Sequence, residues 1–119
     1  MKMQPMSTGQ TIKQYKAIRA EIRAIEADVA RLEQLAGNME ASRARQTIEA
    51  TARQNRERVR ELSAQIQQAD RIIKAMPDKE TKRAVKAHYI QGRPWAAVGP
   101  DRIRKHVKRQ IKKLDNREI

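Results

Sequence analysis

The chain has 119 residues, with 27 Lys or Arg against 14 Asp or Glu and a formal net charge of +13. Only 3% of its residues are aromatic and none is Cys, which excludes disulfides and thiolate metal sites and disfavours a deep apolar pocket. No run approaches the roughly 20 apolar residues of a membrane span, and the first ten residues lack the apolar core of a signal peptide. We therefore expect a soluble intracellular protein with no membrane partner.

Residues 1–10 are expected to form a disordered N-terminal tail. From Tyr15 to Met39, apolar residues then recur in alternating steps of three and four, which is typical of a coiled-coil seam. Gly37 follows the seam and is suited to the left-handed conformation that ends many helices, so we expect this helix to end near Ala36.

A second, longer seam runs from Ile48 to Met76, and Ser42 is the predicted N-cap of its helix. Two helices joined by a short loop fold back antiparallel, so residues 11–76 are predicted to form a helical hairpin. Two helices bury little apolar surface, which favours association into a homodimer or a higher homo-oligomer. Asn55 lies on the seam, where it either sets the register or reaches water.

Residues 77–119 have their own pattern of helix signals. Asp78 is a good N-cap for a helix that extends to about Ile90, and Gly92 is expected to stop it. A short helix is predicted to begin at Pro94, and the last helix follows the Gly-Pro-Asp turn at residues 99–101. The predicted fold is all-α: a long antiparallel coiled-coil hairpin followed by a small helix-turn-helix module.

The last helix combines one apolar stripe with a cationic surface. The stripe contains Ile103, Val107, Ile111 and Leu114. The predicted DNA-binding residues occupy the other faces and are Arg102, Arg104, Lys105, Lys108, Arg109, Lys112 and Lys113. Residues 78–119 hold thirteen Lys or Arg against five Asp or Glu. This excess favours a phosphate-bearing partner over a merely solubilising face.

The near absence of aromatic residues disfavours single-stranded nucleic acid, because bases stack there on aromatic side chains. Double-stranded DNA fits better, since a short helix, a turn and a longer basic helix follow the order of a helix-turn-helix. The recognition helix of that motif enters the major groove by its N-terminal end. The order therefore aims Arg102, Arg104, Lys105 and Lys108 at bases or adjacent phosphates.

The segments KETKRAVKAHYIQGRPWAAVG and IRKHVKRQIKKL resemble the C-terminal module of the RinA-like phage transcriptional regulators. The residues that match the family pattern are Tyr89, Ile90, Gly92, Trp95, Val98, Ile111 and Leu114. The resemblance implies a helical hairpin followed by a sigma-factor region-4-like helix-turn-helix. It also implies sequence-specific binding near promoters in a bacterial host's cytoplasm or nucleoid, with contacts to RNA polymerase.

The Gly-Pro-Asp turn is shorter than in this family. Either the compressed turn still presents the last helix, or the helix binds DNA with less specificity.

Other residues are predicted to have structural roles. Tyr89 and Trp95 are expected to anchor the small C-terminal core, together with Ile103, Val107 and Ile111. The two His residues lie far apart and lack a metal-binding spacing, so we expect no metal. Nucleotide-binding fingerprints, a GxSxG nucleophile elbow and a nucleophilic Cys are absent from the sequence, which predicts a protein that is not an enzyme and uses no cofactor.

Two other functions remain open. The chain is also compatible with a phage assembly or packaging component that resembles small terminase subunits and oligomerises beyond a dimer. A coiled-coil adaptor for an acidic protein surface is the second alternative. The mass of the protein in solution would distinguish the packaging component from a dimeric regulator. The effect on duplex binding of neutral substitutions in the last helix would distinguish the adaptor.

Overall fold

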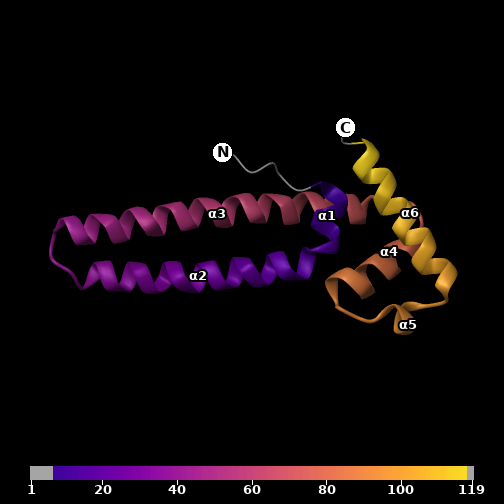
Figure 1. Cartoon of the computed structure of the whole chain (residues 1–119), viewed down its shortest axis with the longest axis horizontal. Helices are drawn as coiled ribbons and strands as arrows, with labels where there is room; N and C mark the ends of the chain where they lie inside the picture. Colours follow the sequence, from indigo (N-terminus) through magenta and orange to yellow (C-terminus); the bar gives the residue numbers. More distant parts are fainter. Residues whose placement is uncertain (1–6, 118–119) are drawn as a thin grey trace. The chain divides into compact units, whose positions relative to one another are not determined.

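A computed structural model of the chain describes residues 7–117. Every regular element in this part of the chain is a helix (Figure 1), so the all-α prediction is confirmed. The elements in chain order are α1 (Thr8–Lys13), α2 (Tyr15–Gly37), α3 (Arg43–Lys74), α4 (Lys79–Val85), the π-helical turn η1 (Lys86–Ile90), α5 (Trp95–Val98) and α6 (Asp101–Arg117).

Helix α1 lies where the sequence was expected to be disordered. The Ser7 hydroxyl accepts a hydrogen bond from the Gln10 N–H at 3.2 Å and caps the helix, and Ile12 is fully buried. The Gly9 N–H also donates to Asp115 Oδ1 at 2.9 Å, which joins α1 to α6. The expectation of disorder is therefore wrong for residues 7–10, and its remainder, residues 1–6, lies outside the described part of the chain.

The chain divides into two compact units: residues 19–64, and residues 7–18 together with 65–117 within the described range. In the first unit, α2 and α3 run side by side in opposite directions (Figure 1). Ion pairs join the two helices, from Arg56 to Glu33 and from Arg58 to Glu21, the latter at 3.7 Å. These pairs are exposed, so the apolar seam contributes more to the pairing than they do.

Local hydrogen bonds determine where α2 ends and α3 begins. Gly37 is the last residue of α2 and has no positive φ, so the expected left-handed C-cap is wrong. The helix instead ends in tight turns, in which the N–H groups of Asn38 and Met39 donate to carbonyls three residues back. The predicted cap of α3 is confirmed, because the Ser42 hydroxyl accepts from the Arg45 N–H at 3.2 Å.

The second unit has a core that combines both ends of the chain. Its buried apolar residues are Ile12, Tyr15, Ile18, Ile66, Ala69, Ile73, Ala84, Val85, Val107 and Ile111. The Tyr15 hydroxyl donates to Asp70 Oδ1 at 2.6 Å and ties the start of α2 to the last part of α3. The compact units therefore do not coincide with the predicted division between residues 76 and 77, because the open end of the helix pair belongs with the C-terminal helices.

Capping and turn residues organise the chain after α3. The Asp78 carboxylate caps α4 as predicted, with Oδ1 accepting from the Glu80 N–H at 3.0 Å and Oδ2 from the Thr81 hydroxyl at 2.5 Å. These hydrogen bonds, led by that of Thr81, lower the pKa of Asp78 below its ordinary value of 3.8. Gly92 adopts φ +76° after η1, which few other residues tolerate.

The contact between Gly9 and Asp115 predicts that Gly9→Ala destabilises the protein when Asp115 is present and stabilises it when Asp115 is replaced by Ala. A Cβ at Gly9 would lie 2.4 Å from Asp115 Oδ1, so Gly9→Ala should expel the carboxylate and cost about 1 kcal/mol of unfolding free energy. In an Asp115→Ala background the carboxylate is absent, and Gly9→Ala should stabilise by up to about 1 kcal/mol through helix propensity. Urea unfolding followed by circular dichroism measures this cycle. The same effect of Gly9→Ala in both backgrounds would contradict the contact.

Candidate nucleic-acid interface

Helix α6 is held by its apolar stripe. Val107 and Ile111 are fully buried, and Ile103 and Leu114 are half-buried. The helix packs against α1, α4 and α5 within the second unit. Two of the predicted anchors, Val107 and Ile111, therefore lie in the core, and burial of this stripe leaves the opposite side of α6 for the solvent.

Six of the seven predicted DNA-binding residues share this solvent side. At about 100° per residue, they fall within an arc of about 140° opposite Val107. We call this surface the α6 cationic face; it consists of Arg102, Lys105, Lys108, Arg109, Lys112 and Lys113, all exposed. Such a one-signed strip fits the phosphates of a nucleic-acid backbone.

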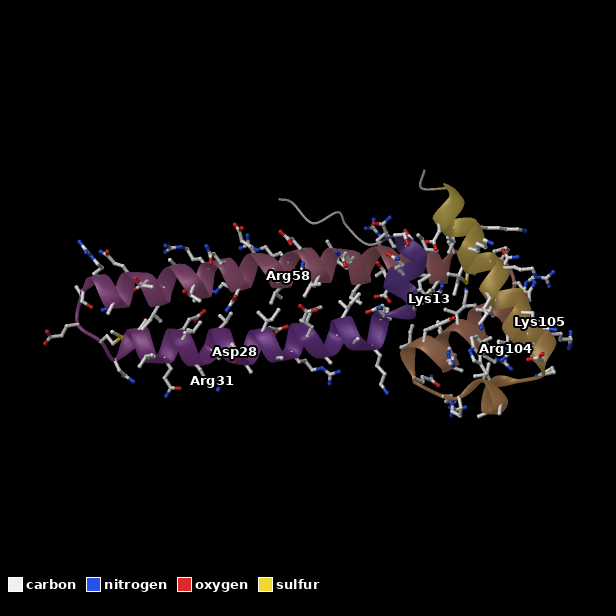
Figure 2. The ribbon with its side chains drawn as sticks, viewed as in Figure 1. Lys13, Asp28, Arg31, Arg58, Arg104 and Lys105 are labelled. Atoms are coloured by element: carbon white, nitrogen blue, oxygen red, sulfur yellow. The ribbon has the colours of Figure 1, made fainter. Side chains whose placement is uncertain are left out.

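Arg104 is the residue that departs from this arrangement. Its side chain is 40% exposed, against 69% for Lys105 and 78% for Arg102. Its Nη2 lies 2.8 Å from Asp101 Oδ1, and its Nε is buried without a hydrogen-bond partner among the described residues. Figure 2 shows both Arg104 and Lys105 on α6. Arg104 lies at the edge of the buried stripe, which does not suit the contact with bases or adjacent phosphates predicted for it.

Acidic residues compensate the first turns of α6 but not the later ones. Arg102 Nη2 lies 3.7 Å from Glu80 Oε1, and Lys105 Nζ lies 3.7 Å from Asp101 Oδ2. In the described part of the chain, no carboxylate lies within 4.0 Å of the other four cations, Lys108, Arg109, Lys112 and Lys113. The uncompensated charge therefore lies further along the helix than the N-terminal end that a helix-turn-helix inserts into the groove.

A cluster of three rings positions α5, which precedes α6. The Trp95 ring stacks on the His88 ring with centroids 3.9 Å apart and meets Tyr89 edge-on at 5.8 Å. Both Tyr89 and Trp95 are half-buried, and burial raises the pKa of the Tyr89 hydroxyl. The two predicted aromatic anchors thus contact each other, at the rim of the unit rather than at its centre.

Sequence reasoning missed the part that His88 plays in this cluster. Its Nδ1 lies 2.7 Å from the Arg93 carbonyl oxygen, and its ring contacts both Tyr89 and Trp95. The signal that was missed is the π-helical turn, in which the Gln91 N–H donates to the Lys86 carbonyl. A regular helix up to Ile90 was expected instead, and the wider turn changes the directions of the side chains that follow it.

The described residues contain neither a metal cluster nor a membrane span. Among residues 7–117, no three His, Asp or Glu side chains gather closely enough to hold a metal ion. None of the helices in that range combines the length and the apolar composition needed to cross a membrane. No family model, curated protein or solved structure matches this chain. The resemblance to RinA-like regulators therefore depends only on the residues quoted for it above.

We expect Trp95→Ala to lower the free energy of unfolding by about 2–3 kcal/mol, because it removes the stacking on His88 and the edge contact with Tyr89. The loss should be smaller than that of a fully buried Trp, since Trp95 is half-buried. Urea unfolding monitored by circular dichroism measures it, and Trp95→Phe is the matched variant that retains a ring. An unfolding free energy unchanged by Trp95→Ala would contradict the anchoring role.

Proposed function

We propose that this protein is a sequence-specific regulator that binds double-stranded DNA through the α6 cationic face. The observation that carries the proposal is the set of six exposed cations on one side of α6, four of them without a carboxylate within 4.0 Å among the described residues. The order of α4 with η1, then α5, then α6 supports a helix-turn-helix-like mode of binding. The RinA-like resemblance supports a regulatory role in transcription, and contact with RNA polymerase stays a prediction.

The connection between α5 and α6 favours phosphate binding as the main source of affinity. Asp101 is already the first residue of α6, so only Gly99 and Pro100 separate the two helices. Helix α5 has four residues, which is short for a helix that supports a recognition helix in the groove. Lys105 and Arg102 are the exposed residues of the first turns, and base contacts are assigned to them in place of Arg104.

Dimerisation through the helix pair is the second part of the proposal. In the unit of residues 19–64, only Val29, Ala36, Ala52 and Leu62 of the apolar seam are buried. The other large apolar residues are half-buried, and Leu35 is 51% exposed. A two-helix layer leaves one apolar side uncovered, and a second copy of the same pair would cover it.

Duplex binding predicts a specific change in salt dependence. The variant Lys105→Gln/Lys108→Gln/Lys112→Gln, here the α6 triple, should flatten the slope of log K against log salt by about 0.9 for each lost phosphate contact, so by about 1.8 for Lys108 and Lys112. The loss of Lys105 should also weaken base contacts. Fluorescence anisotropy with a labelled duplex measures this slope.

The matched control removes three exposed cations from the helix pair: Arg43→Gln/Arg53→Gln/Arg60→Gln, here the hairpin triple. It should leave the slope almost unchanged. An equal decrease of this salt slope in both variants would mean that net charge alone attracts DNA. An absence of binding by the wild-type protein would overturn the proposal and favour the adaptor for an acidic protein.

Dimerisation predicts a solution mass of twice the 13.8 kDa chain. Leu35→Glu places a charge on the uncovered apolar side and should shift sedimentation equilibrium toward the monomer. The matched control is Ala27→Glu, which adds the same charge at an exposed position on the other side of α2 from Val29. A mass well above that of a dimer would favour the assembly component instead.

A further inference from the structure

A second basic surface lies on α4, outside the α6 cationic face. A hollow of about 330 Å³ is lined there by Lys79, Lys82, Arg83, Lys86, Ala87, Gln91 and Arg93. Five of the seven lining residues are cations and none is acidic. We call this surface the α4 hollow.

The charge in the α4 hollow is not compensated. In the described part of the chain, none of its five cations has a carboxylate within 4.0 Å, and the acidic residue of α4, Glu80, pairs instead with Arg102. The Lys16 Nζ lies close to Gly92, the residue between Gln91 and Arg93 of the lining, and adds a further positive charge nearby. Like charges gathered around a concave surface raise the local potential and attract a polyanion.

The α4 hollow and the α6 cationic face point in different directions. Helix α4 packs on α6 and buries Thr81, Ala84 and Val85, whereas Lys79 and Lys82 of α4, with Lys86 of η1, lie on the other side. On α6, Arg102 lies on the side nearer α4, where it pairs with Glu80, and Lys105, Lys108 and Lys112 lie further round the helix. The α4 hollow and these three lysines therefore lie away from the contact between the two helices, on different sides of it.

We propose that the α4 hollow binds the phosphate backbone of a second DNA segment, so that one copy of the C-terminal module bridges two duplex segments. This inference rests on the proposed binding of the first duplex by α6. A straight duplex that lies along Lys105, Lys108 and Lys112 leaves the α4 hollow on the other side of the contact between α4 and α6. Five uncompensated cations around one hollow suit a backbone that carries a charge at every nucleotide.

The test measures capture of a second duplex. The protein is bound to a biotinylated duplex on beads, and retention of a fluorescent duplex from solution is measured. The variant Lys79→Gln/Lys82→Gln/Lys86→Gln, here the α4 triple, should lose about tenfold in capture. Its affinity for a single duplex should stay within about threefold of wild type, and its salt slope on one duplex should be unchanged. The hairpin triple, with the same loss of charge, should capture normally.

The outcomes separate this inference from the proposed function. If the α6 triple binds one duplex as the wild type does, the proposed function fails. If single-duplex binding depends on α6 but the α4 triple still captures the second duplex, the inference is overturned, because a dimer then bridges through two α6 faces. Absence of capture by the wild-type protein also overturns it, and the α4 hollow would then fit an acidic protein.

A second measurement covers the case in which the α4 triple fails to fold. The chain has no Cys, so Gln91→Cys introduces a single attachment site at the edge of the α4 hollow. With added hydrogen peroxide and ascorbate, an iron chelate attached there generates hydroxyl radicals that cleave nearby DNA. The inference expects strand cleavage in the fluorescent second duplex, and cleavage confined to the bead-bound duplex would overturn it.

Discussion

Burial of the apolar stripe of α6 is the constraint on which the candidate interface depends. Val107 and Ile111 have no exposed surface, and they lie among residues from both ends of the chain. Once this side is buried, helical geometry requires Lys105, Lys108 and Lys112 to lie outside. The cationic face is thus a consequence of core packing, and its shape depends on contacts that α6 makes with α1 and α4.

The same constraint explains why charge and hydrogen bonding differ along α6. At its start, Asp101 and Glu80 balance the nearby cations, and the pair between Glu80 and Arg102 joins α4 to α6. At its end, Asp115 is hydrogen-bonded to the Gly9 N–H of α1. The cations of the middle turns make no such ion pair or hydrogen bond among the described residues, so they are available to a ligand. Phosphate binding and helix docking therefore use different residues of one helix.

Local signals in the sequence predicted the features that depend on neighbouring residues. Ser42 and Asp78 cap their helices as expected, because a cap needs only a hydroxyl or carboxylate two or three residues before the N–H that it accepts from. The apolar stripe of α6 was also recognised, since its spacing is local. Helix α1 was missed because Asp115, its partner, lies 106 residues away from Gly9 in the sequence.

The direction of side chains was harder to predict than the existence of helices. A regular helix to Ile90 would aim His88 differently, and only the π-helical turn explains how its ring meets Trp95. Arg104 was grouped with the exposed cations because of its charge. It precedes the exposed Lys105 by one residue, and this difference in position around the helix places it beside the core. The basic residues of α4 were counted in the net charge, but their gathering around one hollow required the packed structure. Two basic surfaces occur on one small module because α4 and α6 each bury one side in the core, which leaves their other sides to water and to polyanions.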